Sequence, residues 1–311
     1  MSNTGISRRS AILLGGSVPA MMVLPALAQG QAPATEQEAP MAQTHTVQLG
    51  GFQITTMLGG AAMREKPIET FGVGADAAEF EKLSEANFIP SDRSGQSFTL
   101  TLVKTPDALV LFDTGMVPDV NKAALAAAGY APDDVTHVVL THMHGDHVSG
   151  LMQDGKPVFA KAQLIAPKDE NDYWAANPSE AYTTHVVPLI DKATLIGDGD
   201  QVLPGITAAA AYGHTPGHTT YLLESDGQKL LITGDSFNHY VYSVQRPEWH
   251  VRFDVDKDMG ATTRKAVLAR LAADRIPFIG YHMPFPALAF IAPGEAEGTF
   301  RYVPATYQFA G

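Results

Sequence analysis

Three histidines and an aspartate lie within six consecutive positions of this 311-residue chain, and their spacing can hold metal ions. The segment is His-Met-His-Gly-Asp-His at 142–147. In an extended stretch alternate side chains share a face, so His142 and His144 can point at one ion, while Asp146 and His147 turn toward a neighbouring one. The opposing interpretation is a chance cluster of histidines on a surface loop. The spacing favours two metals.

The chain has no cysteine, which limits the kind of metal site that it can form. Disulfides, thiolate zinc sites and cysteine nucleophiles are excluded, and any metal must be held by nitrogen and oxygen atoms. Imidazole and carboxylate ligands suit zinc, with manganese, cobalt and iron as alternatives. A structural zinc would usually be enclosed by cysteines. The cluster is therefore predicted to be an open, catalytic site.

The elements around the cluster predict where it lies in the fold. Residues 133–141 form a β-branched apolar run typical of a buried strand, and a helix is expected from about Val148. Residues 98–103 and 108–112 predict a hairpin. Further strands are predicted at 163–166, 206–211, 219–223 and 230–233, and helices at 121–128 and 261–273. This order accommodates two mixed sheets packed face to face, with helices outside and the metals in the loops at one end.

Four later segments complete a recognisable pattern. They are Leu-Phe-Asp-Thr-Gly at 111–115, Tyr-Gly-His-Thr-Pro-Gly-His at 212–218, Ile-Thr-Gly-Asp at 232–235 and Gly-Tyr-His at 280–282. Each is weak alone, but in this order, together with the cluster, they resemble the metallo-β-lactamase superfamily. The resemblance implies an α/β (α+β) fold, the four-layer αββα metallo-β-lactamase sandwich, formed as a single domain by residues 46–311.

The resemblance also implies the ligands of a two-metal centre. The first ion would be bound by three imidazoles, those of His142, His144 and His214. The second would be bound by a carboxylate and two imidazoles, those of Asp146, His147 and His282. Asp235 would bridge the pair, Asp113 would accept a hydrogen bond from a ligand imidazole, and His218 would be a structural member of its loop. Without the cluster, His214 and His282 would be interpreted as half-buried, hydrogen-bonded histidines and Asp235 as a turn residue.

The expected mechanism is metal-assisted hydrolysis. Zinc lowers the pKa of a bound water from far above neutrality to about 7, a change that no isolated carboxylate base matches. Two Zn²⁺ ions are thus the expected cofactors, and a hydroxide bridging them is the expected nucleophile. Asp146 and Asp235 are the expected catalytic residues, and Asp146 would also carry a proton toward the leaving group.

The substrate is predicted from a narrower similarity. The segments at 234–239, 281–286 and 300–304 are most similar to the exported branch that contains methyl parathion hydrolase and related lactonases. This similarity implies hydrolysis of neutral esters or lactones, and of organophosphate triesters as well. Quorum-quenching lactonases often carry a tyrosine three residues after the bridging aspartate, but this chain has Asn238 there. Tyr240 and Tyr242 are the candidate replacements.

An apolar pocket for an acyl chain or an aryl group is expected beside the metals. Its candidates are Trp174, Phe237, His239 and Phe285, with Tyr173 and Trp249 as further aromatic residues near the motifs. Ordinary core packing is the alternative for each aromatic residue.

The first residues predict export. A Ser-Arg-Arg-Ser segment at 7–10 precedes an apolar run at 11–27 and an Ala-Leu-Ala segment at 26–28. This pattern resembles a twin-arginine-type signal peptide over residues 1–28, which directs a protein to the periplasm or outside the cell. The alternative, a membrane anchor, is disfavoured because the run is short and contains glycine and proline. Residues 29–45 are rich in Gln, Ala, Pro and Glu and predict a disordered lead-in.

Charge and resemblance together limit the partners. The formal charge is −12, and loss of Arg8 and Arg9 with the signal would take it to −14. An acidic protein repels polyanions, so nucleic acid is excluded and a small neutral substrate is expected. No stable membrane anchor is expected, and the resemblance suggests a homodimer. Two alternatives stay open: a β-lactamase of the same fold, and a non-hydrolytic di-metal redox or binding protein.

Overall fold

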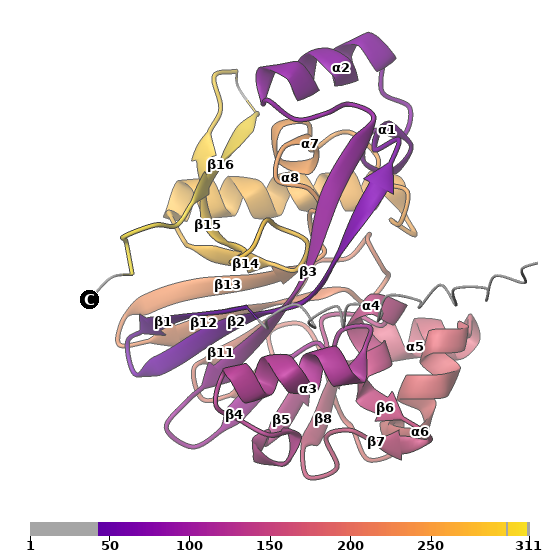
Figure 1. The fold of residues 1–311 in the computed structure, drawn as a ribbon, viewed down its shortest axis with the longest axis vertical. Helices are drawn as coiled ribbons and strands as arrows, with labels where there is room; N and C mark the ends of the chain where they lie inside the picture. The colour runs from indigo at the N-terminus through magenta and orange to yellow at the C-terminus, as the bar shows by residue number, and fades with distance from the viewer. Residues whose placement is uncertain (1–42, 297, 310–311) are drawn as a thin grey trace, which may run out of the picture. The chain divides into compact units, whose positions relative to one another are not determined.

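The structure is a computed structural model that describes residues 43–296 and 298–309. Within these residues the chain forms two seven-stranded sheets and a small two-stranded ribbon, with helices on the outer faces of the sheets (Figure 1). The predicted signal peptide at 1–28, and the predicted lead-in as far as residue 42, lie outside the described residues.

The first sheet has the strand order β1-β2-β3-β4-β5-β8-β9. Its strands are β1 Thr44–Leu49, β2 Phe52–Glu65, β3 Arg93–Lys104, β4 Leu109–Phe112, β5 His137–Val139, β8 Gln163–Pro167 and β9 Thr194–Ile196. The pairs from β1 to β4 are antiparallel, and those from β4 to β9 are parallel. The long strands β2 and β3 run beyond the others toward α1 and α2, which are Ile68–Phe71 and Ala77–Ala86 (Figure 1).

The second sheet has the order β10 to β16 in sequence. Its strands are β10 Gln201–Leu203, β11 Ile206–Ala210, β12 Thr219–Ser225, β13 Gln228–Gly234, β14 Phe278–Gly280, β15 Leu288–Pro293 and β16 Phe300–Pro304. All neighbours are antiparallel except β13 and β14, which are parallel. The parallel pair arises because α8, Lys257–Asp274, lies between the two strands in the sequence. The ribbon is formed by β6 Met152–Gln153 and β7 Lys156–Pro157.

Helices and the core complete a four-layer sandwich. Strand β4 illustrates the layering, because its four residues are all buried and point alternately to opposite sides. Leu111 packs in the cluster that includes Leu125 of α3, Pro118–Ala127, on the outer face of the first sheet. Phe112 packs against Tyr221 between the two sheets, in a cluster that also takes in Leu268 of α8. The predicted α/β sandwich is therefore confirmed.

Most predicted elements are present, but the strand predicted over 133–141 is limited to β5, His137–Val139, because Pro132–Asp134 forms a turn of 3-10 helix. Two further differences are found. The first concerns α4, Gly145–Val148, which ends where the sequence predicted a helix to begin. The chain turns at once after His144, whose carbonyl oxygen accepts the N–H groups of His147 and Val148. The second concerns β1, which begins at Thr44 and so includes two residues assigned to the lead-in. In the described part of the chain, no helix is long and apolar enough to cross a membrane.

Candidate metal centre

The parallel strand pairs bring distant side chains to one edge of the sandwich. Asp113 directly follows β4, and residues 142–147 closely follow its parallel neighbour β5. Asp235 directly follows β13, and His282 closely follows the parallel strand β14. His214 lies in the loop between β11 and β12. Because the carboxyl ends of parallel strands meet at one edge, both sheets present histidines and carboxylates to the same space.

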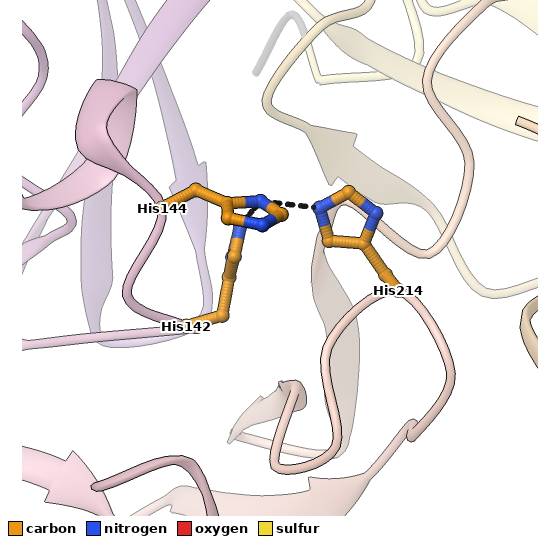
Figure 2. Close-up of side chains that lie close together, drawn as sticks. All are labelled: His142, His144 and His214. Atoms are coloured by element: carbon orange, nitrogen blue, oxygen red, sulfur yellow. Dashed lines mark hydrogen bonds between the residues drawn. The ribbon is translucent and has the colours of Figure 1, made fainter. Parts of the chain in front are cut away.

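One group of side chains consists of three imidazoles. His142 and His144 project from one loop and His214 from the loop that faces it (Figure 2). Nδ1 of His144 lies 3.1 Å from Nε2 of His142 and 3.0 Å from Nε2 of His214. Burial, followed by the neighbouring His214, lowers the pKa of His144 to about 3. Burial also lowers the pKa of His142 well below its usual value, so the rings of His142 and His144 are neutral at neutral pH, the form in which imidazole binds metal.

A second group lies beside the first and contains Asp146, His147 and His282. Oδ2 of Asp146 is 3.3 Å from Nε2 of His282 and 3.7 Å from Nε2 of His147. The far nitrogen of His282, Nδ1, donates to the carbonyl oxygen of Ser97 at 2.9 Å, so Nε2 faces its group. Tyr281 packs against the ring of His147 with centroids 3.9 Å apart, and its hydroxyl donates to the carbonyl oxygen of Asp146.

Asp235 faces both groups. Its Oδ1 lies 3.4 Å from Nε2 of His147, and its Oδ2 lies 3.3 Å from Nε2 of His214 and 3.1 Å from Nε2 of His282. Asn238 donates to Oδ2 at 2.9 Å. His218 accepts the backbone N–H of Asp235 on Nε2 at 3.0 Å. This aspartate is therefore held in place from two sides.

Two buried atoms at the centre lack hydrogen-bond partners among the described residues, namely Nε2 of His147 and Oδ1 of Asp235. Unpaired buried polar atoms are rare because they lose their hydration without compensation. Burial alone would lower the pKa of His282, but Asp235 and Asp146 outweigh burial and raise it to about 9. A divalent cation would supply the positive charge that these carboxylates attract and would satisfy both unpaired atoms. The side chains present therefore fit metal ions.

Asp113 orients the second group from behind. Its Oδ2 accepts from Nδ1 of His147 at 2.9 Å, and Oδ1 and Oδ2 also accept from the backbone N–H and the hydroxyl of Thr141 at 2.8 Å each. A hydrogen bond on Nδ1 leaves the lone pair of Nε2 free to face the centre. His218 is oriented in a similar way. Its Nδ1 donates to the carbonyl oxygen of Ala211 at 3.1 Å, which leaves Nε2 free to accept the backbone N–H of Asp235.

Sequence reasoning missed two buried carboxylates that support the first group. Asp254 accepts from Nδ1 of His214 at 2.9 Å and from Nη2 of Arg264 at 2.6 Å. Glu170, in α5 Lys168–Ala176, accepts the backbone N–H of Met143 at 2.9 Å and that of Gly217 at 3.0 Å. Neither acid belongs to a motif. The one available signal for Glu170 is that its neighbours on the same face of α5, Tyr173 and Trp174, are aromatic and half-buried, which makes an acidic residue there unusual.

A cavity of about 500 Å³ opens over both groups. Besides residues of the two groups and Asp235, it is lined by Arg64, Phe98, Met116, Gly145, Ser149 and Phe253. A second cavity of about 600 Å³ also borders His282 and is lined in part by Tyr240 and Phe285. A small molecule can therefore reach the centre from a space with mainly apolar walls.

The predicted pocket residues fall in different places. Phe285 lines the cavity beside His282, and Trp174 packs edge-on against His144 with centroids 5.7 Å apart. Phe237 is fully buried in the core against Phe278, because it points away from the centre. His239 is buried too, where it accepts backbone N–H groups on Nδ1 and donates from Nε2 to the hydroxyl of Ser94. This placement corrects the prediction that Phe237 and His239 line the pocket.

Tyr240 and Tyr242, the candidates for the role of the tyrosine that is absent at position 238, lie in different surroundings. Tyr240 lines the cavity beside His282, half-buried. Tyr242 is fully buried, with its hydroxyl 2.9 Å from that of Ser84 and its ring stacked on Phe80. Tyr242 is therefore part of the core.

Comparison with protein families decides the classification. Residues 99–257, just over half of the 311-residue chain, match the family model described as the metallo-beta-lactamase superfamily. The chain belongs to this superfamily. At the level of the superfamily, the match supports a metal-dependent hydrolase.

Several curated relatives in the superfamily are lactonases. The chain is 32% identical to an N-acyl homoserine lactonase of Bacillus sp over 126 residues, which are 40% of this chain and 47% of the relative. It is 26% identical to an N-acyl homoserine lactonase of Bacillus cereus over 188 residues, which are 47% of this chain and 72% of the relative. The match thus spans about half the length of the Bacillus sp enzyme.

Solved structures of the superfamily share the fold. One is AidC, described as a dizinc quorum-quenching lactonase in complex with a product, with a TM-score of 0.78, 24% identity and coverage of 86% of this chain and 99% of AidC. Another is AbOPH, described as a hydrolase in the beta lactamase superfamily, with a TM-score of 0.77, 24% identity and the same coverage of both chains. At this identity the likeness concerns the fold alone.

Proposed function

We propose that this chain is a hydrolase with two divalent metal ions, zinc by preference, that opens lactones and cleaves neutral carboxylic esters. The observation that carries the proposal is the position of Asp235, whose Oδ1 lies 3.4 Å from Nε2 of His147 and whose Oδ2 lies 3.3 Å from Nε2 of His214. One carboxylate thus faces both histidine groups. The relatives named as N-acyl homoserine lactonases make lactones the first substrates to test.

The side chains divide naturally between two ions. His142, His144 and His214 would hold one, with nitrogens that lie within 4.8 Å of one another. The other would be held by Asp146, His147 and His282, which meet the same distance limit. Bound divalent ions lower the pKa of a water molecule toward 7 and polarise the carbonyl that is attacked.

The chain's own residues then manage the protons. Hydrolysis adds water to the carbonyl carbon, breaks the bond from that carbon to the alcohol oxygen, and returns a proton to this oxygen. Burial alone would raise the pKa of Asp146, but His147 and His282 outweigh it and hold this pKa below its usual range. Asp146 is thus ionised at neutral pH and lines the cavity, where it can accept the proton of water and pass it to the leaving alkoxide.

Neutral phosphotriesters with phenol leaving groups are a second substrate class in the proposal. A phenolate needs little proton assistance to leave, so these compounds depend less on Asp146. The largely apolar wall with Phe98, Met116 and Phe253 suits an aryl or acyl group. Cephalosporins represent the alternative of a β-lactamase.

The test is a side-by-side rate comparison on purified protein. The substrates are an acyl homoserine lactone, an aryl ester, a methyl phosphotriester and a cephalosporin, and metal content is measured on the same sample. We expect about two zinc ions per chain, fastest turnover of the lactone or aryl ester, and loss of activity with a chelator. One metal or none at full activity would contradict the dinuclear assignment. Fastest turnover of the cephalosporin would favour a β-lactamase, and iron with visible absorbance and no hydrolysis would favour the redox alternative.

Export and assembly are proposed on separate grounds. The paired arginines at 8–9 and the Ala-Leu-Ala segment at 26–28 support a twin-arginine-type signal and a periplasmic or secreted protein. Cell fractionation of the full chain, with Lys in place of Arg8 and Arg9 as the comparison, tests this location. Loss of export in the double variant is the expected result. A homodimer is tested by light scattering on the purified protein.

A further inference from the structure

Arg64 lies in the wall of the cavity that opens over both histidine groups. It is near the end of β2, and its partner in the register is Ser94 of β3. Side chains alternate along a strand, so Gln96 and Phe98 of β3 share a face with Ser94 and therefore with Arg64. Phe98 lines the same cavity. The part of β2 and β3 that extends past the sheet thus places the guanidinium group of Arg64 beside the candidate metal centre.

The guanidinium group is held in one orientation. Its Nε donates to Oε1 of the buried Gln96, and its central carbon lies 4.9 Å from the ring centroid of Phe253. A planar guanidinium that is already fixed loses little conformational entropy when it makes further hydrogen bonds. The arrangement therefore prepares the Nη atoms to bind a ligand.

The Nη atoms of Arg64 have no acceptor within residues 43–296 and 298–309, where the bond to Gln96 is the one hydrogen bond of this side chain. An arginine with a purely structural role would normally pair with a carboxylate or a carbonyl group. Phe98, Met116 and Phe253, which line the cavity with Arg64, have no side-chain acceptor, and the other lining residues, Ser149 among them, make no hydrogen bond to Arg64. An oxygen atom of the substrate would supply the hydrogen-bond acceptor that the Nη atoms of Arg64 lack.

We propose that Arg64 is a specificity-determining residue whose guanidinium binds an oxygen acceptor of the substrate a few bonds away from the scissile carbonyl. The acceptor is an amide carbonyl or a carboxylate, because both can receive the paired N–H groups of an arginine. The inference rests on the proposed function and deepens it. It means that esters and lactones bearing such an acceptor are preferred over plain alkyl esters and lactones.

The test compares three γ-butyrolactones that differ at one ring substituent. One carries a hexanoylamino group, one an alkyl chain of the same length, and one a carboxymethyl group, whose oxygens lie as many bonds from the ring carbonyl as the amide oxygen does. Arg64→Met removes the N–H donors and keeps a long apolar side chain. Arg64→Lys keeps the positive charge but lacks the planar pair of N–H donors. Arg270→Met, on the outer helix α8, is the matched control. Metal content and circular dichroism of each variant are compared with those of the wild type.

We expect Arg64→Met to raise KM about 10- to 100-fold for the lactone with the acceptor, because one hydrogen bond to a charged donor is lost. Its kcat should change little, and the alkyl lactone should be hydrolysed as by the wild type. A selective effect on the hexanoylamino lactone identifies an amide carbonyl. A larger effect on the carboxylate lactone, restored in part by Arg64→Lys and weakened by salt, identifies an anion. Equal losses on all three lactones, or no loss on any, would overturn the proposal.

Binding of the ring-opened products, measured by calorimetry, separates this inference from the proposed function. A wild type that hydrolyses none of the lactones refutes the proposed function. If its binding still discriminates the acylamino from the alkyl product, and Arg64→Met removes that discrimination, Arg64 keeps its role. A wild type that hydrolyses lactones while Arg64→Met retains all selectivity refutes the role of Arg64 alone.

Discussion

Nδ1 of His214 donates to Oδ1 of Asp254 across 2.9 Å, in a buried contact that the motif around His214 does not reveal. The other oxygen of Asp254 accepts from Nη2 of Arg264 at 2.6 Å. The hydrogen bond fixes which nitrogen of His214 faces the other imidazoles. Asp254 would therefore act on a bound metal through His214.

Asp254→Asn should weaken metal binding by the three-histidine group about 10- to 100-fold, as loss of a partner behind a ligand usually does. It should also lower the free energy of unfolding by about 3 kcal/mol, because Arg264 loses its buried counter-charge. Metal titration and urea unfolding measure the two effects. The exposed Asp258→Asn is the control. Wild-type metal affinity in Asp254→Asn would refute the positioning role.

Asp235→Asn should reduce turnover by at least about 100-fold while the fold is retained, since a partner behind a ligand already costs that much. The amide keeps one acceptor oxygen but replaces the other with a donor, so it cannot face two cations at once. Metal analysis should show fewer than two ions per chain. A variant that keeps two ions and normal turnover would show that Asp235 does not bridge.

Glu170→Gln should lower the free energy of unfolding by about 1–3 kcal/mol. In the wild type one carboxylate oxygen accepts the N–H of Met143 and the other accepts the N–H of Gly217. The glutamine side chain puts an NH₂ group in place of one of these oxygens, so one backbone N–H would face a donor and lose its acceptor. Urea unfolding of the metal-free protein measures this effect without a contribution from metal binding. Glu180→Gln, an exposed acid in the next segment, should be neutral.

Gly217→Ala should disrupt the loop that carries His214. A Cβ atom on Gly217 would lie 1.9 Å from the backbone nitrogen of Glu170, so the loop must move away from α5. We expect a loss of more than about 4 kcal/mol in stability or a failure to fold. Gly197→Ala is the control, because the nearest atom to its Cβ would be a side-chain oxygen 3.7 Å away. A thermal melt of Gly217→Ala like that of Gly197→Ala would contradict the packing described.

The sequence predicted those parts of the fold that depend on local pattern. The hairpin of β3 and β4 and the strands β11, β12 and β13 of the second sheet follow from short apolar runs that can be recognised from the local sequence alone. The group at 142–147 was visible for the same reason, because its members are neighbours in the chain. The motifs around His214 and His282 added the distant members only through their resemblance to a family.

Partners that depend on tertiary packing could not be predicted. Asp254 and Glu170 are single acids whose roles follow from where a loop and a helix pack, and no spacing encodes that. Phe237 shows the opposite error, since an aromatic residue two positions after Asp235 is close in sequence but points into the core. Like Asp254 and Glu170, Arg64 could not be predicted, because it reaches the cavity only through the part of β2 that extends beyond the sheet.

The division of the histidines between the two sheets has a consequence for folding. His142 and His147 follow a strand of the first sheet, whereas Asp235 and His282 follow strands of the second. Ions held by both sets would cross-link the sheets at one edge, so their affinity would contribute directly to the free energy that keeps the sheets together. Amide hydrogens near the ends of β5 and β13 should then exchange faster once the ions are removed, while those of α8 keep their protection.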